Sequence, residues 1–149
     1  MRNVLKVGLL SMFLMLLSTG CGAKTKTLTC NKTSDENDKT SMSQDVEVIF
    51  KDDKITDINQ KIKMTIKDKY QAYVDVMADS VRKRYDSLKD KEGIEFKVTV
   101  KDNVIDTVLN AKLDQIDEDA KKQLSIENIS SKTYEETIKS LEDSGYNCK

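Results

Sequence analysis

The cysteines are the residues of this chain with the most distinctive chemistry. There are three, Cys21, Cys30 and Cys148, and there is no histidine. Without histidine the chain contains neither a Ser-His-Asp nor a Cys-His catalytic set, and it contains no His-containing metal site. The two sulfurs of Cys30 and Cys148 make a poor metal site without any histidine, so we expect no metal ion and no other cofactor.

The segment before Cys21 has the pattern of a secretory signal. Arg2 and Lys6 give it a positive start, and residues 7–17 carry no charge, as the apolar part of a signal requires. This run is shorter than the about 20 apolar residues that a membrane-spanning helix needs. Residues 1–20 are therefore predicted to be a signal peptide that is removed from the mature protein.

The boundary Leu17-Ser18-Thr19-Gly20-Cys21-Gly22 resembles the lipobox of bacterial lipoproteins, although Ser18 stands where that motif usually has leucine. The resemblance implies that cleavage leaves Cys21 as the amino terminus, with a diacylglyceryl group on its thiol. Two acyl chains attach a protein to a membrane almost irreversibly. We expect a lipid-anchored protein on the extracytoplasmic face of a bacterial cell membrane, with residues 21–26 as its tether. The alternatives are a plain signal peptide or an uncleaved anchor, with an incidental cysteine.

Cys30 and Cys148 remain as a pair once Cys21 is lipidated. Outside the cytoplasm an even number of cysteines predicts a disulfide, which here would join the first structured segment to the penultimate residue. Closing so long a loop stabilises a fold by roughly 4–5 kcal/mol in the chain-entropy model. Two free thiols or a redox-active pair are the alternatives, but neither a Cys-x-x-Cys spacing nor an activating setting is evident.

Composition limits the size and the partners of the folded part. The chain has 149 residues, 34% of them charged, with a formal net charge of −1. Residues 27–149 are enough for a single domain and too few for a two-lobed solute-binding protein. Without a basic excess we expect no nucleic-acid partner.

Apolar residues alternate with polar ones in two places, which predicts two β-hairpins. The first covers residues 46–66 with a polar turn at 51–54, and the second covers residues 94–113 with a turn at 101–103. They align at an offset of 50 residues, by duplication or by convergence on one hairpin pattern. The polar segment between Lys32 and Gln44 has the composition of a solvated loop.

Helical periodicity predicts one long helix and a shorter one at the C-terminus. Residues 68–88 carry an apolar stripe at three- and four-residue spacing, namely Tyr70, Tyr73, Val74, Met77, Ala78, Val81, Tyr85 and Leu88. A short helical turn is expected at residues 117–120. The last helix begins with a capping box between Thr133 and Glu136 and ends near Gly145. The predicted fold is α+β, an antiparallel sheet built from two hairpins and packed against one long amphipathic helix and a C-terminal helix.

This combination resembles the YehR-like small bacterial lipoproteins, a family with a domain of unknown function. The residues that carry the resemblance are the lipobox cysteine, the two hairpins around one long helix, and the ending Gly145-Tyr146-Asn147-Cys148-Lys149. The resemblance implies acylation of Cys21 and supplies no catalytic or ligand-binding residue.

The acidic residues are the remaining candidates for chemistry. Asp52/Asp53 and Asp117/Asp119 are pairs that could bind a cation or serve in acid–base catalysis, but turns and helix starts favour such pairs. We expect a non-enzymatic module that binds a protein, peptide or small ligand or has a structural role. A small cation-binding or hydrolytic domain that uses the acidic turns is one alternative. An accessory subunit of an envelope transport or sensing complex is the other.

Overall fold

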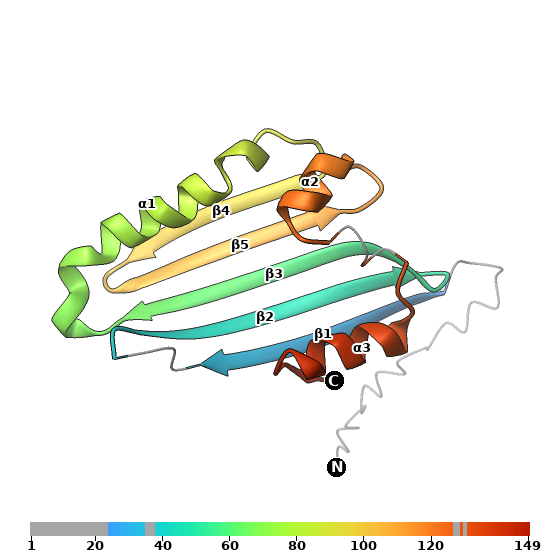
Figure 1. Cartoon of the computed structure of the whole chain (residues 1–149), viewed down its shortest axis with the longest axis horizontal. Helices are drawn as coiled ribbons and strands as arrows, with labels where there is room; N and C mark the ends of the chain where they lie inside the picture. The colour runs from blue at the N-terminus through green and yellow to red at the C-terminus, as the bar shows by residue number, and fades with distance from the viewer. Residues whose placement is uncertain (1–23, 35–37, 127–128, 130) are drawn as a thin grey trace, which may run out of the picture.

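The protein is an α+β domain in which all helices cover one face of a single sheet (Figure 1). The computed structural model describes residues 24–34, 38–126, 129 and 131–149. The predicted signal peptide and Cys21 lie outside these residues. The predicted fold class is confirmed, because an antiparallel sheet packs against a long helical segment and a C-terminal helix.

The sheet has six antiparallel strands in the order β4-β5-β3-β2-β1-β6. The two predicted hairpins are β2–β3 and β4–β5, and they are joined through the pairing of β3 with β5. The strand bounds are Thr25–Ser34 (β1), Thr40–Lys51 (β2), Lys54–Ile66 (β3), Ile94–Lys101 (β4), Val104–Lys112 (β5) and Asn147–Cys148 (β6).

The segment expected to be a solvated loop is mostly strand. Its first residues end β1 and its last residues begin β2, so that Lys32 pairs with Gln44 and Ser34 pairs with Met42. The prediction was wrong because it read side-chain polarity, whereas backbone hydrogen bonds to the neighbouring strand hold these residues. Polar side chains are compatible with such strand ends because they stay in contact with water.

The long helical segment has an α-helical centre and 3₁₀ turns on either side. The predicted 68–88 range contains η1 (Asp68–Tyr73), α1 (Val74–Arg84) and η2 (Asp86–Leu88). Tyr73, expected on the buried stripe, is 57% exposed. A 3₁₀ turn has three residues per turn instead of 3.6. The side chain of Tyr73 therefore points in a different direction from the buried side chains of Val74 and Ala78.

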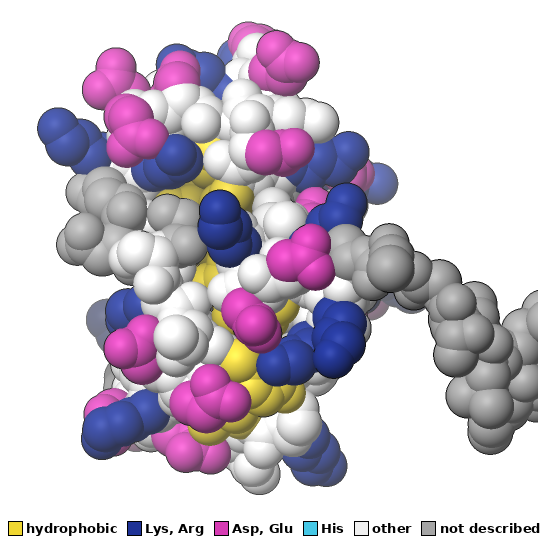
Figure 2. All heavy atoms as spheres, turned by 90° about the vertical axis from the view of Figure 1, so that its right-hand side faces the viewer, with side chains coloured by type: hydrophobic (Ala, Val, Ile, Leu, Met, Phe, Trp, Pro, Cys, Tyr) yellow, Lys and Arg dark blue, Asp and Glu magenta, His cyan; other side chains and the backbone are white. Residues whose placement is uncertain are grey.

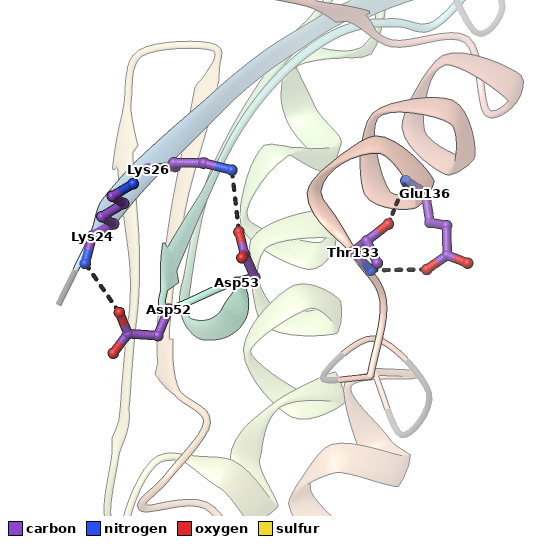
Figure 3. Close-up of polar contacts among 6 residues, drawn as sticks. All are labelled: Lys24, Lys26, Asp52, Asp53, Thr133 and Glu136. Atoms are coloured by element: carbon purple, nitrogen blue, oxygen red, sulfur yellow. Dashed lines mark hydrogen bonds and ion pairs between the residues drawn. The ribbon is translucent and has the colours of Figure 1, made fainter.

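Two further helices pack on the same face. The predicted helical turn at residues 117–120 is α2 (Glu118–Gln123), and the C-terminal helix is α3 (Tyr134–Asp143). The predicted capping box of α3 is confirmed and is visible in Figure 3. The Thr133 hydroxyl oxygen accepts from the Glu136 amide, and the Glu136 carboxylate accepts from the Thr133 amide, which lowers the pKa of Glu136.

The helices divide the core into two clusters. The larger lies under α2 and α3 and includes Leu28, Val48, Phe50, Leu113 and Ala120. The smaller lies under η1 and α1 and includes Ile66, Val74, Ala78 and Ile105.

Two of the three strand positions between the clusters carry polar side chains, Gln44 on β2 and Thr107 on β5. Gln44 pairs with Ile62, and Ile62 pairs with Thr107 across β2, β3 and β5. The Tyr146 hydroxyl donates to Gln44 Oε1 at 2.5 Å, and burial raises the pKa of Tyr146. The helix-facing side of the sheet is therefore not one continuous apolar surface.

Candidate functional site

An apolar groove runs along α1 on the side that faces the middle of the sheet. Its hollow measures about 310 Å³ and is lined by Lys39, Thr40, Met64, Val76, Met77, Ser80 and Val81. Val76 is 63% exposed, the larger exposed fraction of the two exposed large apolar side chains among the described residues. We refer to this hollow as the α1 groove.

The placement of the helices explains why the groove is open. η1 and α1 pack on β3, β4 and β5 through the smaller core cluster, whereas α3 contacts β1 and β6. Figure 1 shows that α1 and α3 lie over opposite edges of the sheet. Met64, which faces the helices beside Ile66, is therefore left half-buried at the groove floor. The methionines of the groove are flexible and polarizable, which suits an apolar partner of variable shape.

Other hollows are lined mainly by charged and polar residues. One of about 520 Å³ lies beside α3 and is lined by Ser131, Lys132, Glu136, Lys139, Ser140 and Asp143. Two more, of about 180 and 290 Å³, lie on the sheet face without helices and share Asp45 and Lys61. Charges of both signs alternate there, as on an ordinary solvated sheet face. Among these hollows the α1 groove is the one in which an apolar ligand would find apolar walls.

The predicted disulfide is present in the structure. Cys30 and Cys148 are bonded, with the sulfurs 2.02 Å apart, and they face each other in the register of β1 and β6. Cys30 is fully buried in the larger core cluster. The bond therefore fastens the end of the chain to its first strand.

The acidic pairs have structural partners. Asp117 caps α2 by accepting from the Ala120 amide at 2.7 Å, and it accepts from Lys91 Nζ at 2.5 Å. The bond from Lys91, and next the bond from Ala120, lower the pKa of Asp117. These contacts explain the Asp117/Asp119 pair as the acidic start of a helix.

Asp52 and Asp53 hold the start of β1. The Lys24 amide donates to Asp52 Oδ1 at 3.0 Å, and the Asp52 amide donates to the Lys24 carbonyl at 3.0 Å. Lys26 Nζ donates to Asp53 Oδ1 at 3.1 Å, which raises the pKa of Lys26, and it also lies 5.5 Å from the ring centre of Tyr134. Figure 3 shows both carboxylates turned toward the two lysines. We call these contacts the N-terminal clamp.

Neither a metal cluster nor a membrane-spanning helix is found in the described part of the chain. Within the ranges that the structure describes, no cluster of three or more His, Cys, Asp or Glu side chains could hold a metal ion. Over the same ranges no helix has both the length and the apolar character needed to cross a membrane.

The fold and the groove define a small α+β domain whose one-sided antiparallel sheet is incompletely covered by helices. Two solved structures share this fold. An NMR structure of a protein from Streptococcus pneumoniae TIGR4 is 15% identical, with a TM-score of 0.63, and the match covers 100% of this chain and 99% of that chain. The NMR structure of the E. coli YehR protein is 17% identical, with a TM-score of 0.60, covering 85% and 92%.

These likenesses establish a YehR-like fold. No protein-family model matches the sequence, and no curated protein matches it significantly. The α1 groove is the feature that sequence reasoning missed. Met77 and Val81 were assigned to the buried stripe, Met64 to the first hairpin, and Lys39 and Thr40 to a loop. The available signal was Val76, an apolar residue that lies outside the stripe.

Proposed function

We propose that this protein is a lipid-anchored binding module of the bacterial envelope. Cys21 carries the lipid, the body lies on the extracytoplasmic side of the membrane, and the α1 groove binds an apolar segment of another protein or a peptide. The single observation that carries the binding role is the groove itself. Val76 on its wall is 63% exposed beside Met64, Met77 and Val81, and hollows of about this size with mainly apolar walls are typical sites for apolar ligand groups.

The anchor is supported by the sequence. A positive start, a short apolar run and small residues directly before Cys21 form a lipoprotein signal. A disulfide between Cys30 and Cys148 fits the same compartment, because disulfides persist where the surroundings are oxidising.

Replacing Cys21 by alanine tests the anchor. We expect the variant to be released from the membrane or to stay unprocessed, since no thiol remains to accept the diacylglyceryl group. Fractionation of cells and mass spectrometry of the amino-terminal peptide measure this. Membrane retention of the C21A variant after removal of the signal would contradict the anchor, and C148A serves as the cysteine control.

A photo-crosslinker in place of Ser80 tests the groove in intact cells. We expect one discrete adduct, whose loss in the Val76→Asp variant shows that the partner occupies the groove. Because Val76 is mostly exposed, this substitution should leave the thermal midpoint within a few degrees of the native value. A crosslinker at Thr99, which points to the opposite face of the sheet, is the matched control.

Two outcomes would overturn the groove as a binding site. One is the same adducts from Ser80 and Thr99, and the other is an adduct at Ser80 that Val76→Asp leaves unchanged. An adduct with a subunit of a transport or sensing complex would identify the module as an accessory subunit.

A further inference from the structure

The N-terminal clamp is built from both central residues of the β2–β3 turn. Asp52 and Asp53 have φ values of 51° and 62°, so both central residues of the β2–β3 turn are left-handed, as in a type I′ turn. Asparagine, aspartate or glycine is usual at the first of these positions and glycine at the second, so Asp52 fits its position and Asp53 replaces the usual glycine. Side chains at both positions carry a steric cost, yet here each carboxylate binds the start of β1.

The clamp lies next to the site of the lipid. Only residues 22 and 23 stand between Cys21 and Lys24, so the Cα atoms of Cys21 and Lys24 are at most about 11 Å apart. An acylated Cys21 would thus keep the β1 start and the β2–β3 turn close to the bilayer. A tether that ends at the fixed residues Lys24 and Lys26 allows the folded domain less rotation relative to the membrane than a tether that ends in a loose segment.

We propose that the clamp is an orientation device and that the end of the sheet formed by Lys24, Lys26 and the β2–β3 turn faces the lipid headgroups. This inference rests on the proposed anchor at Cys21. With the clamp end at the headgroups, the strands point away from the membrane surface. The opposite end of the sheet, where α1 and the α1 groove begin, then projects outward toward a partner.

The dimensions of the sheet separate the two ends. β3 runs from Lys54 at the clamp to Ile66 beside η1, and at about 3.3 Å per residue this strand spans roughly 40 Å. In Figure 1 the clamp end of the sheet is at the right, and η1 and the start of α1 are at the left. When the clamp end of the domain contacts the headgroups, the start of α1 is therefore too far from the bilayer to contact it.

Surface charge alone does not orient the clamp end. Figure 2 views the molecule from this end and shows lysine, arginine and acidic side chains intermixed, with hydrophobic side chains at the surface only in a narrow strip. Anionic headgroups attract a basic cluster and gain little from such a mixture. The short covalent link between Cys21 and Lys24, together with the clamp contacts, must therefore set the orientation of the domain on the membrane.

Fluorescence quenching on vesicles tests the orientation. The acylated protein is placed in vesicles of phosphatidylglycerol and phosphatidylcholine that carry a nitroxide on a fraction of the headgroups. One environment-sensitive fluorophore is attached at Lys54→Cys or at Lys69→Cys, which are exposed sites at opposite ends of the sheet. We expect at least about threefold stronger quenching at the Lys54 site, because roughly 40 Å of strand separates the labels.

The clamp is tested by the double variant Asp52→Gly and Asp53→Gly. Gly-Gly fits a type I′ turn, so the hairpin should keep its circular dichroism spectrum and thermal midpoint while both carboxylates are lost. We expect the difference between the labels to shrink to less than about half in this variant. Asp102→Gly changes the left-handed aspartate of the β4–β5 turn at the other end of the sheet, and it should leave the difference unchanged.

The outcomes separate this inference from the anchor on which it rests. Equal quenching of the two labels would overturn the orientation, and a difference that survives loss of both carboxylates would overturn the clamp as its cause, while the mass of an acylated Cys21 still supports the anchor. An unmodified Cys21 and a protein that does not bind the vesicles would overturn both.

Discussion

Replacing Cys148 by alanine is expected to lower the free energy of unfolding by about 4 kcal/mol. The disulfide joins residues 118 positions apart, and a constraint of that length removes much of the conformational freedom of the unfolded chain. Cys148 is only half-buried, so the lost packing adds little. Urea denaturation of residues 24–149, followed by circular dichroism, measures the change.

Thiol labelling is the control for this prediction. The native domain should react with no thiol reagent unless it is reduced, and C148A should show one thiol, at Cys30, that reacts only on unfolding because Cys30 is fully buried. Two reactive thiols in the native domain, or a urea midpoint that C148A does not change, would contradict the structural role of the bond.

Replacing Gly93 by alanine is expected to cost about 3 kcal/mol or more, as the sum of a left-handed backbone and a steric clash. Gly93 has a φ of +75° at the start of β4, and a Cβ there would lie 2.6 Å from Gln115 Cβ and 3.1 Å from the Lys112 carbonyl oxygen. These atoms belong to the chain that leaves β5, so neither can move away without disturbing the hairpin. The same denaturation experiment measures the loss.

Gly145 provides a matched control for Gly93. Its φ is +85°, but a Cβ there would meet only the end of the Lys32 side chain, at 3.6 Å, which is an ordinary contact. Gly145→Ala should therefore cost only about 1 kcal/mol, the backbone part of the effect. Equal losses for the two variants would show that the predicted clash at Gly93 is relieved by local movement.

Local sequence patterns predicted the elements whose partners are adjacent in the chain. Val46, Val48 and Phe50 alternate with polar residues, and all three are buried. The capping box of Thr133 and Glu136 is a contact within one helical turn and formed as expected. Such features depend on spacing over a few residues, which a sequence displays directly.

Features that depend on distant contacts were harder to predict. The ends of β1 and β2 have polar side chains, and only their mutual register shows that they are strands. Tyr73 matched a helical stripe, but the segment before α1 is a 3₁₀ turn. The α1 groove exists because α1 and α3 lie over opposite edges of the sheet. The spacing of residues along the chain does not show how far apart two helices lie on a sheet. The disulfide was predictable because the number of cysteines and the predicted compartment both favoured it.

The division of the core into two clusters has a consequence for the dynamics of the domain. The disulfide secures the cluster under α3, whereas α1 is held by few buried side chains, chiefly Val74 and Ala78. Segments with little buried surface open with a smaller free energy than the whole domain does. Amide hydrogens of α1 should therefore exchange with deuterium well before those of β1 and β2. A partner bound beside Val76 would slow that exchange, which makes the protection of α1 amides a direct readout of occupancy.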